Sequence, residues 1–272
     1  MSIELLNLGC GNRFHRDWVN VDFVSNDALV REYDLRRGIP YSDNRFNGVY
    51  HSHVLEHFTK EQGSYFIKEC YRVLKPEGIV RVVVPDLEQI ARNYLDALRN
   101  VTEDSTNLNS AAYEWSVAEL LDQIVRESSG GEIKKIWSQE TIINEQQIIS
   151  RVGHEFISFR ENYLHDMQSH TSVAKNSIVH SLKRRVRNLL MRCLKVSHED
   201  LQTSRFKNCG ECHKWMYDRH SLKALLISCG FKEVDIKTAW ESGMPNWSSY
   251  LSLDVEDGVL RKPDSLYMEA IK

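Results

Sequence analysis

The sequence has no long apolar run and no excess of basic residues. None of its apolar stretches reaches the roughly 18 residues of a membrane-spanning helix, so we expect no transmembrane segment. Its 35 Lys and Arg residues against 38 Asp and Glu residues give a net charge of −3, which offers no case for a nucleic-acid partner. A charged and then apolar leader is also missing, so we expect a cytoplasmic protein.

Cysteine is sparse, with six residues in 272, and only Cys209 and Cys212 lie close together. Without an export signal, we interpret all six as reduced thiols. The string Cys209–His213 matches a haem attachment pattern, but two thiols are too few for a structural zinc site. We interpret the string as a chance match in which His213 is the functional residue.

The most informative stretch is Leu5–Gly11, followed by Trp18–Asp22. It predicts a buried strand, a glycine turn and a second strand that ends in an acid. In α/β sheets such glycines let the backbone approach a nucleoside-bearing cofactor, while the acid holds ribose hydroxyls. A third glycine is missing, so a strand and turn without a ligand remains the alternative.

The first hundred residues alternate strand and helix patterns. We predict strands over Phe46–His51 and Ile79–Val84, separated by a helix that Thr59 and Gln62 cap and Lys75–Gly78 stops. Strands separated by helices predict an α/β fold with a Rossmann-like, doubly wound, mostly parallel sheet.

Residues 100–213 break this rhythm, with helical patterns at 119–126 and 140–150 and few strand signals. The α/β pattern resumes at Trp215, with a helix capped by Asp218 and final strands over 234–237 and 266–271. We therefore predict a core of residues 1–99 and 214–272 and a mainly helical insertion, 100–213, before the last strands. The insertion would close over substrate as a lid.

The stretch Lys183–Lys195 mixes four arginines with apolar side chains. Such a helix can lie on a membrane surface or meet an acidic partner. We favour the simpler interpretation of a lid helix with a solvated basic face.

The order of these pieces resembles the class I S-adenosylmethionine (SAM) dependent methyltransferases, closest to the type 11-like, small bacterial members with a helical insertion. The resemblance is carried by six motifs and leaves the middle of the chain uncovered: Asn7–Gly11, Trp18–Asp22, His53–Phe58, Val73–Gly78, Val84–Leu87 and Leu226–Phe231.

The resemblance implies a cofactor site. The backbone of Gly9, Cys10 and Gly11 would wrap the methionine part of SAM, and Asp22 would accept hydrogen bonds from the ribose hydroxyls. Asp34 would take the adenine amino group beside Leu35. The remaining residues implied are His51 and Ser52, near the methyl group, and Asn7, which stands where many relatives have an acid and would contact the amino group more weakly or through water.

His53, Glu56 and His57 form the candidate catalytic cluster, because they follow the strand that would end beside the methyl donor. Placing the acceptor in line supplies much of the rate of methyl transfer, and a base such as His57 or His53 would help a hydroxyl acceptor. Two other interpretations stay open: a structural turn, and a divalent-metal site like the Glu-x-x-Glu-His of some O-methyltransferases, in which His53 replaces the first acid. Our predicted catalytic set is His53, Glu56, His57 and His213, without a metal.

The predicted function is methyl transfer to a small or medium acceptor, such as a hydroxyl of a sugar, a glycan precursor or another metabolite. Three alternatives come from other classes: a zinc peptidase of the inverted His-x-x-Glu-His type with Glu132 or Glu140 as third ligand, an NAD-dependent oxidoreductase, and a non-catalytic SAM-binding module. The missing third glycine disfavours the oxidoreductase.

Overall fold

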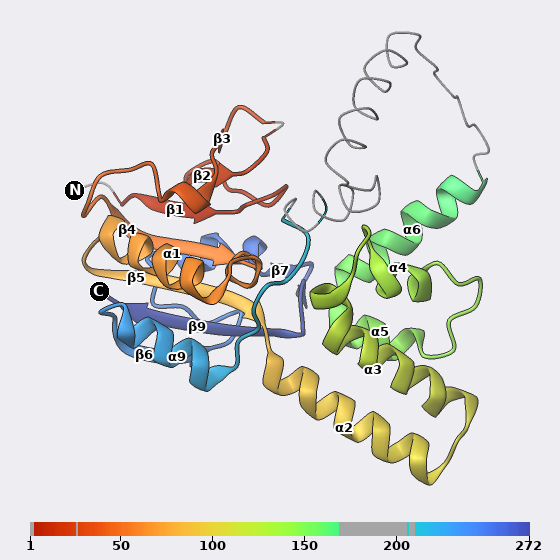
Figure 1. Cartoon of the computed structure of the whole chain (residues 1–272). Coiled ribbons are helices and arrows are strands. Elements are labelled where there is room, and N and C mark those ends of the chain that lie inside the picture. The colour runs from red at the N-terminus through yellow and green to blue at the C-terminus, as the bar shows by residue number, and fades with distance from the viewer. Residues whose placement is uncertain (1–2, 26, 169–205, 207–209) are drawn as a thin grey trace, which may run out of the picture.

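The computed structural model describes residues 3–25, 27–168, 206 and 210–272 (Figure 1). Its centre is a seven-stranded sheet in the order β3-β2-β1-β4-β5-β9-β6. The first five strands are parallel, whereas β9 lies antiparallel between β5 and β6. The mostly parallel, Rossmann-like α/β sheet is therefore confirmed. Its strands are β1 (Leu5–Leu8), β2 (Val19–Asp22), β3 (Val30–Glu32), β4 (Phe46–Ser52), β5 (Leu74–Pro85), β6 (Lys232–Lys237) and β9 (Ser265–Ile271).

Two helices, α1 (Lys60–Val73) and α9 (Arg219–Ser228), cover one face of the sheet. Thr59 and Gln62 form the predicted capping box of α1, and Asp218 caps α9. Both helices bury one apolar side against alternate residues of the strands, because successive strand side chains point to opposite faces. The shared core includes Leu6, Leu8, Val80, Val82, Phe66, Ile67, Leu222 and Leu226.

The opposite face is covered by the segment before β9 rather than by α-helices. This segment contains two short 3-10 helices, η3 (Trp247–Ser249) and η4 (Leu251–Leu253), and the hairpin of β7 (Val255–Glu256) with β8 (Val259–Leu260). Its aromatic rings pack against strand residues of this face, such as Tyr50 and Val83. The sheet is thus buried on both sides, as parallel sheets are.

Five helices stand between β5 and α9 in the described part of the chain, in a group beside the sheet (Figure 1). They have a core of their own, which includes Trp115, Trp137, Ile148 and Phe156. The helix α2 runs across the expected boundary at residue 100, and the stretch 183–195 lies outside the described residues. The helices are α2 (Leu87–Glu103), α3 (Asn107–Val125), α4 (Gly131–Trp137), α5 (Glu145–Val152) and α6 (His154–Gln168). None of the described helices is long and apolar enough to span a membrane.

Two local features differ from the sequence pattern. The short strand β3 lies in a stretch without strand periodicity, since only Val30 of its three residues is buried. The helix α1 ends at Val73, before Lys75–Gly78 as expected, but β5 already begins at Leu74. Residues 75–78 have no register partner on β4, because the pairing passes from Leu74 opposite Phe46 to Ile79 opposite Gly48.

Candidate active site

The candidate site lies where β1 and β4 end side by side. The strand order reverses here, because β2 and β3 follow on one side of β1 while β4 and β5 follow on the other. Parallel sheets bind ligands outside the carboxyl ends of their strands at such a switch point. Gly9 follows β1 and His53 follows β4, so the topology brings both predicted motifs to one edge.

The glycine turn is held by backbone hydrogen bonds. The Gly9 amide donates to the Val21 carbonyl at 2.8 Å, and the Gly11 amide donates to the Asp22 carboxylate at 2.7 Å. Gly9 has a φ of +63°, and a Cβ there would collide with the side chain of Val54. Gly11 has a φ of +53° but open space around it. The turn therefore needs glycine at residue 9 for packing as well as conformation.

Asp22 and Asp34 line one cavity of about 370 Å³, together with Gly9 and Leu35. The Asp34 carboxylate is bound by the guanidinium of Arg36, with Nε at 2.8 Å. Hydrogen bonding to Arg36 lowers the pKa of Asp34, so the group is a carboxylate near neutral pH. We call this space, with Asp22, Asp34 and Leu35 on its wall, the nucleoside cavity.

A second cavity, of about 520 Å³, lies on the other side of the glycine turn. Burial raises the pKa of the Cys10 thiol to about 12, so it is neutral. The Asn7 amide donates to the Arg13 carbonyl at 3.0 Å, which ties the turn to the strand. The cavity brings together five of the predicted cofactor residues, Asn7, Gly9, Cys10, Gly11 and Ser52, and the predicted catalytic residue His53.

His51 is placed differently from the other predicted residues. Its ring is fully buried against Phe66, lines none of the three cavities described in this section, and has no hydrogen-bond partner in the described part of the chain. Burial lowers the pKa of His51 to about 4 despite the nearby Glu56 carboxylate, so the ring is neutral.

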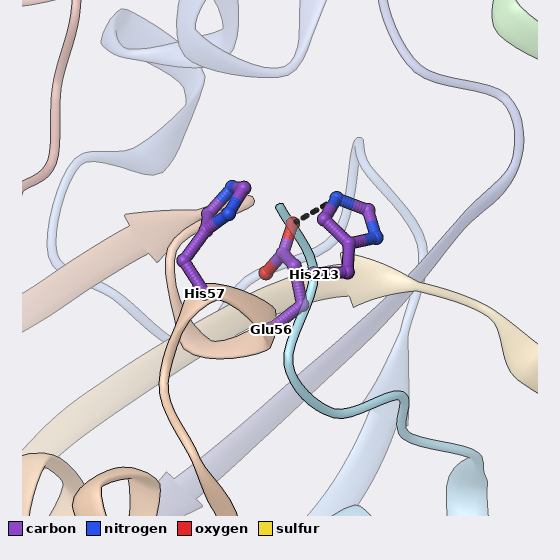
Figure 2. A group of neighbouring side chains, drawn as sticks. All are labelled: Glu56, His57 and His213. Atoms are coloured by element: carbon purple, nitrogen blue, oxygen red, sulfur yellow. Dashed lines mark ion pairs between the residues drawn. The ribbon is translucent and has the colours of Figure 1, made fainter. Parts of the chain in front are cut away.

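The predicted catalytic residues form one cluster. Glu56 and His57 lie on the 3-10 helix η2 (Leu55–His57), and His213 comes from the segment that leads to α9. Figure 2 shows the Glu56 carboxylate between the rings of His57 and His213. The His213 Nε2 lies 4.0 Å from Glu56 Oε1, and the His53 Nδ1 lies 3.3 Å from the same oxygen.

Backbone hydrogen bonds hold η2 against the segment around His213, which lies far away in the sequence. The Glu56 carbonyl accepts from the amides of Lys214 at 2.7 Å and Trp215 at 3.2 Å, and the His213 amide donates to the Gln123 carbonyl at 2.9 Å. The His57 Nδ1 lies 3.2 Å from the Cys212 carbonyl. The structure thus joins η2, α3 and the 212–215 segment around the four side chains.

Glu56 is fully buried, yet it is ionised. Burial raises its pKa, but the contact with His53 and the fields of His213 and His57 outweigh burial and lower it. Burial lowers the pKa of His213 to about 3, although Glu56 opposes this. The cluster therefore holds a carboxylate beside a neutral His213 ring near neutral pH.

The third cavity, of about 560 Å³, opens between this cluster and the helices α3, α4 and α6. We call it the acceptor cavity. His53, Glu56, His57 and His213 line its sheet side, while Trp115, Trp137 and Phe159 are among the residues of its helical side. The two tryptophans give no signal of a site in the sequence, because their spacing along the helices is that of ordinary core residues.

The stretch of the chain that contains His53, Glu56 and His57 matches a known family. Residues 10–82 match the family model of a methyltransferase domain. This match bears out the predicted resemblance to class I SAM-dependent methyltransferases and the predicted enzyme class, and it supports SAM as the cofactor.

Solved structures similar to this chain include a SAM-dependent methyltransferase from Archaeoglobus fulgidus, at 14% identity and a TM-score of 0.39 over 99% of this chain and 86% of that one. A Thermotoga maritima protein described as a possible histamine N-methyltransferase has 12% identity and a TM-score of 0.40, over 100% and 83%. A 1,6-didemethyltoxoflavin-N1-methyltransferase from Burkholderia thailandensis, with 1,6-didemethyltoxoflavin and S-adenosylhomocysteine bound, has 18% identity and a TM-score of 0.26, over 30% of this chain and 45% of that one. No curated protein matches the chain.

The third ligand that we considered for the zinc-peptidase alternative, Glu132 or Glu140, lies outside the cluster. Glu132 and Glu140 are both exposed, and neither lines the acceptor cavity. Glu132 instead pairs with Lys135 at 2.5 Å. An inverted zinc-peptidase site needs that carboxylate beside the two histidines, so the geometry does not favour it.

Proposed function

We propose that this methyltransferase transfers a methyl group from SAM to a hydroxyl of a small acceptor, such as a sugar, a glycan precursor or another metabolite. One observation carries the proposal: among the described residues, only His53 lines all three cavities. A side chain at the junction of cofactor space and acceptor space is where a transferred group would pass.

The residues on the cofactor side fit SAM. The two oxygens of Asp22 each accept one backbone amide, from Gly11 and Val24, and keep lone pairs for ribose hydroxyls. The turn Gly9–Gly11 would follow the methionine part, with Leu35 and Asp34 on the adenine side. When bound, SAM supplies an activated methyl group on a positively charged sulfur.

The acceptor cavity suits a small molecule with an apolar face. Its volume falls in the range of small-ligand sites, roughly 300–1,000 Å³. The rings of Trp115 and Trp137 line it, and their indole N–H groups have no acceptor within the described residues. Such walls would hold a ring while polar groups at the sheet edge orient its hydroxyls.

His53 is the residue we assign to the acceptor's proton. Its Nδ1 lies 3.3 Å from the Glu56 carboxylate and its Nε2 lies 2.8 Å from the Ser265 hydroxyl. A carboxylate behind an imidazole fixes the ring and stabilises its protonated form. An acceptor hydroxyl that replaces Ser265 at Nε2 would then have a positioned base.

Calorimetry with SAM and with NAD tests the cofactor side. We expect SAM to bind, and Asp22→Ala to lower its affinity by about 10- to 100-fold, since hydrogen bonds to a charged group contribute about 1.5–3 kcal/mol. Asp27→Asn is the matched control, because Asp27 follows the same strand but lines none of the three cavities. Binding of NAD alone would refute the assignment.

The transfer itself is tested with methyl-labelled SAM and the small-molecule fraction of a cell extract. We expect label in a small hydroxyl-bearing product with the unchanged protein and its loss with His53→Gln, while SAM affinity stays within a few-fold. Label confined to macromolecules would contradict the small acceptor. SAM binding without any labelled product would favour the non-catalytic module.

A further inference from the structure

We propose that Glu56, His57 and His213 bind a divalent transition-metal ion on the floor of the acceptor cavity. The binding itself follows from these three side chains alone. The use of the ion to hold the acceptor rests on the proposed function.

The three residues already have the spacing of an open metal site. Each offers one ligand atom, and the three atoms lie within 4.8 Å of one another (Figure 2). Metal–ligand bonds of about 2.0–2.2 Å place neighbouring ligand atoms roughly 3–3.5 Å apart. Modest side-chain rotations would therefore close the site around an ion.

An unsatisfied buried carboxylate points into this cluster. Glu56 is fully buried, and neither of its carboxylate oxygens has a hydrogen-bond partner in the described part of the chain. His53 and His213 approach Oε1 only to 3.3 Å and 4.0 Å. Buried charges are paired or coordinate metals, and this one lacks a full partner set.

The surroundings of His57 match those of metal-binding histidines. Such a histidine donates its second ring N–H to a carbonyl or carboxylate, which fixes the tautomer and orients the ring. His57 Nδ1 lies 3.2 Å from the Cys212 carbonyl, so it donates there and its Nε2 keeps a lone pair. His53, held between Glu56 and Ser265, would orient the carboxylate from behind.

The donor set indicates which ion is bound and what it could hold. Two imidazoles and one carboxylate suit zinc, iron, cobalt or manganese better than magnesium or calcium, which prefer oxygen ligands. Three protein ligands leave coordination positions free towards the cavity, as in catalytic sites. The ion would favour an acceptor with two adjacent oxygens, because such a pair can chelate it.

Metal binding can be measured without SAM and without an acceptor. The purified full-length protein is stripped with a chelator, dialysed and titrated with Co²⁺, followed by visible absorption and by metal content per chain. We expect one Co²⁺ per chain, and at least a 100-fold loss of affinity in Glu56→Gln and in His57→Gln. The matched control is His220→Gln, an exposed histidine on α9 that should bind Co²⁺ as the unchanged protein does.

A second readout separates loss of the site from loss of the fold. Co²⁺ should raise the thermal unfolding midpoint of the unchanged protein and of His220→Gln, but not that of His57→Gln, whose own midpoint without metal should stay close to that of the unchanged protein. No binding, or binding that survives both Glu56→Gln and His57→Gln, would overturn the metal site. Co²⁺ binding by a protein that methylates no acceptor would instead refute the proposed function and leave the metal site standing.

Discussion

Two buried carboxylate clusters lie on opposite sides of the sheet. In one, which we call the complete cluster, Arg81 hydrogen-bonds to Asp254 and Glu269; in the other, Glu56 makes no such hydrogen bonds within the described residues. On one side, the fully buried Arg81 guanidinium reaches Asp254 with Nη2 at 2.9 Å and Glu269 with Nη1 at 2.9 Å, and it also bonds three carbonyls. On the other, Glu56 has three histidines around it and no hydrogen bond to either oxygen.

The two clusters differ in role: the first stabilises the fold, and the second is the metal site that we propose. Arg81 connects β5 to β9 through Glu269 and to the covering segment through Asp254, which also lines the second cavity. Tyr50 donates to the free oxygen of Asp254 at 2.6 Å, so that carboxylate is satisfied by the chain itself. Glu56 lines a cavity, and in the described part of the chain its closest partners are the His53 Nδ1 at 3.3 Å and the His213 Nε2 at 4.0 Å.

The largest effect should come from breaking the complete cluster. Arg81→Met leaves Asp254 and Glu269 buried without their cation, so we expect a loss of about 3–5 kcal/mol in the free energy of unfolding. Urea denaturation measures it. Co²⁺ affinity of the folded fraction should not change, and a loss below about 1 kcal/mol would mean that the cluster does not hold the fold.

Acid should act next most strongly, through His51 on β4. Its pKa is about 4 in the folded chain against 6.5 in its ordinary state. Below pH 6.5 the unfolded chain therefore binds a proton that the folded chain does not, and stability falls as the pH drops towards 4, by about 3 kcal/mol for this group.

The variant His51→Leu should remove that part of the acid sensitivity, because its side chain has no proton to bind. Urea denaturation at several pH values between about 7 and 4 measures the difference from the unchanged protein. His220→Gln, which changes an exposed histidine, should leave the slope as it is. A His51→Leu curve parallel to that of the unchanged protein would show that His51 titrates normally in the fold.

A milder change removes a single hydrogen bond from the complete cluster. Tyr50→Phe removes the hydroxyl that donates to Asp254 but keeps the ring packed against Trp18 and Trp247. We expect a loss of about 2 kcal/mol, the typical contribution of a hydrogen bond to a charged group. Thermal or urea unfolding measures it, and an unchanged midpoint would mean that Arg81 alone satisfies Asp254.

The sequence predicted those parts of the fold that depend on neighbours along the chain. The glycine turn, the acid at the end of β2, the caps of α1 and α9 and the α/β alternation all follow from local pattern, and the structure contains them. Arg81 gave no such signal, because a single arginine within a valine-rich strand looks like a solvent-facing residue. Its partners Asp254 and Glu269 lie 173 and 188 residues away.

The acceptor cavity also depends on contacts between residues that are far apart in the sequence. His53, Glu56 and His57 form a local motif in the sequence, whereas His213 was predicted separately, within the string Cys209–His213. Ser265 reaches His53 because β9 pairs antiparallel with β5, a pairing that no short-range pattern encodes. The tryptophans of the cavity wall read as core, and by burial they are core. Function at this edge therefore depends on long-range pairings that periodicity does not report.

The smallest change in stability should come from Glu56→Gln, and it distinguishes the two clusters most sharply. In the metal-free protein the substitution removes a buried charge whose only close partners are His53 and His213, and the new amide can donate to the neutral His213 ring. We therefore expect the free energy of unfolding to change by less than about 1 kcal/mol, because the amide avoids the cost of burying a charge but loses the attraction of the histidines that lowers the pKa of Glu56. Urea denaturation after chelation measures this, and repeating it with Co²⁺ at about 100 times its dissociation constant should stabilise the unchanged protein by about 2.7 kcal/mol but not the variant. If Glu56→Gln instead costs as much as Arg81→Met without metal, then Glu56 is paired with its histidines as a structural ion cluster, and both sides of the sheet are held by the same kind of interaction.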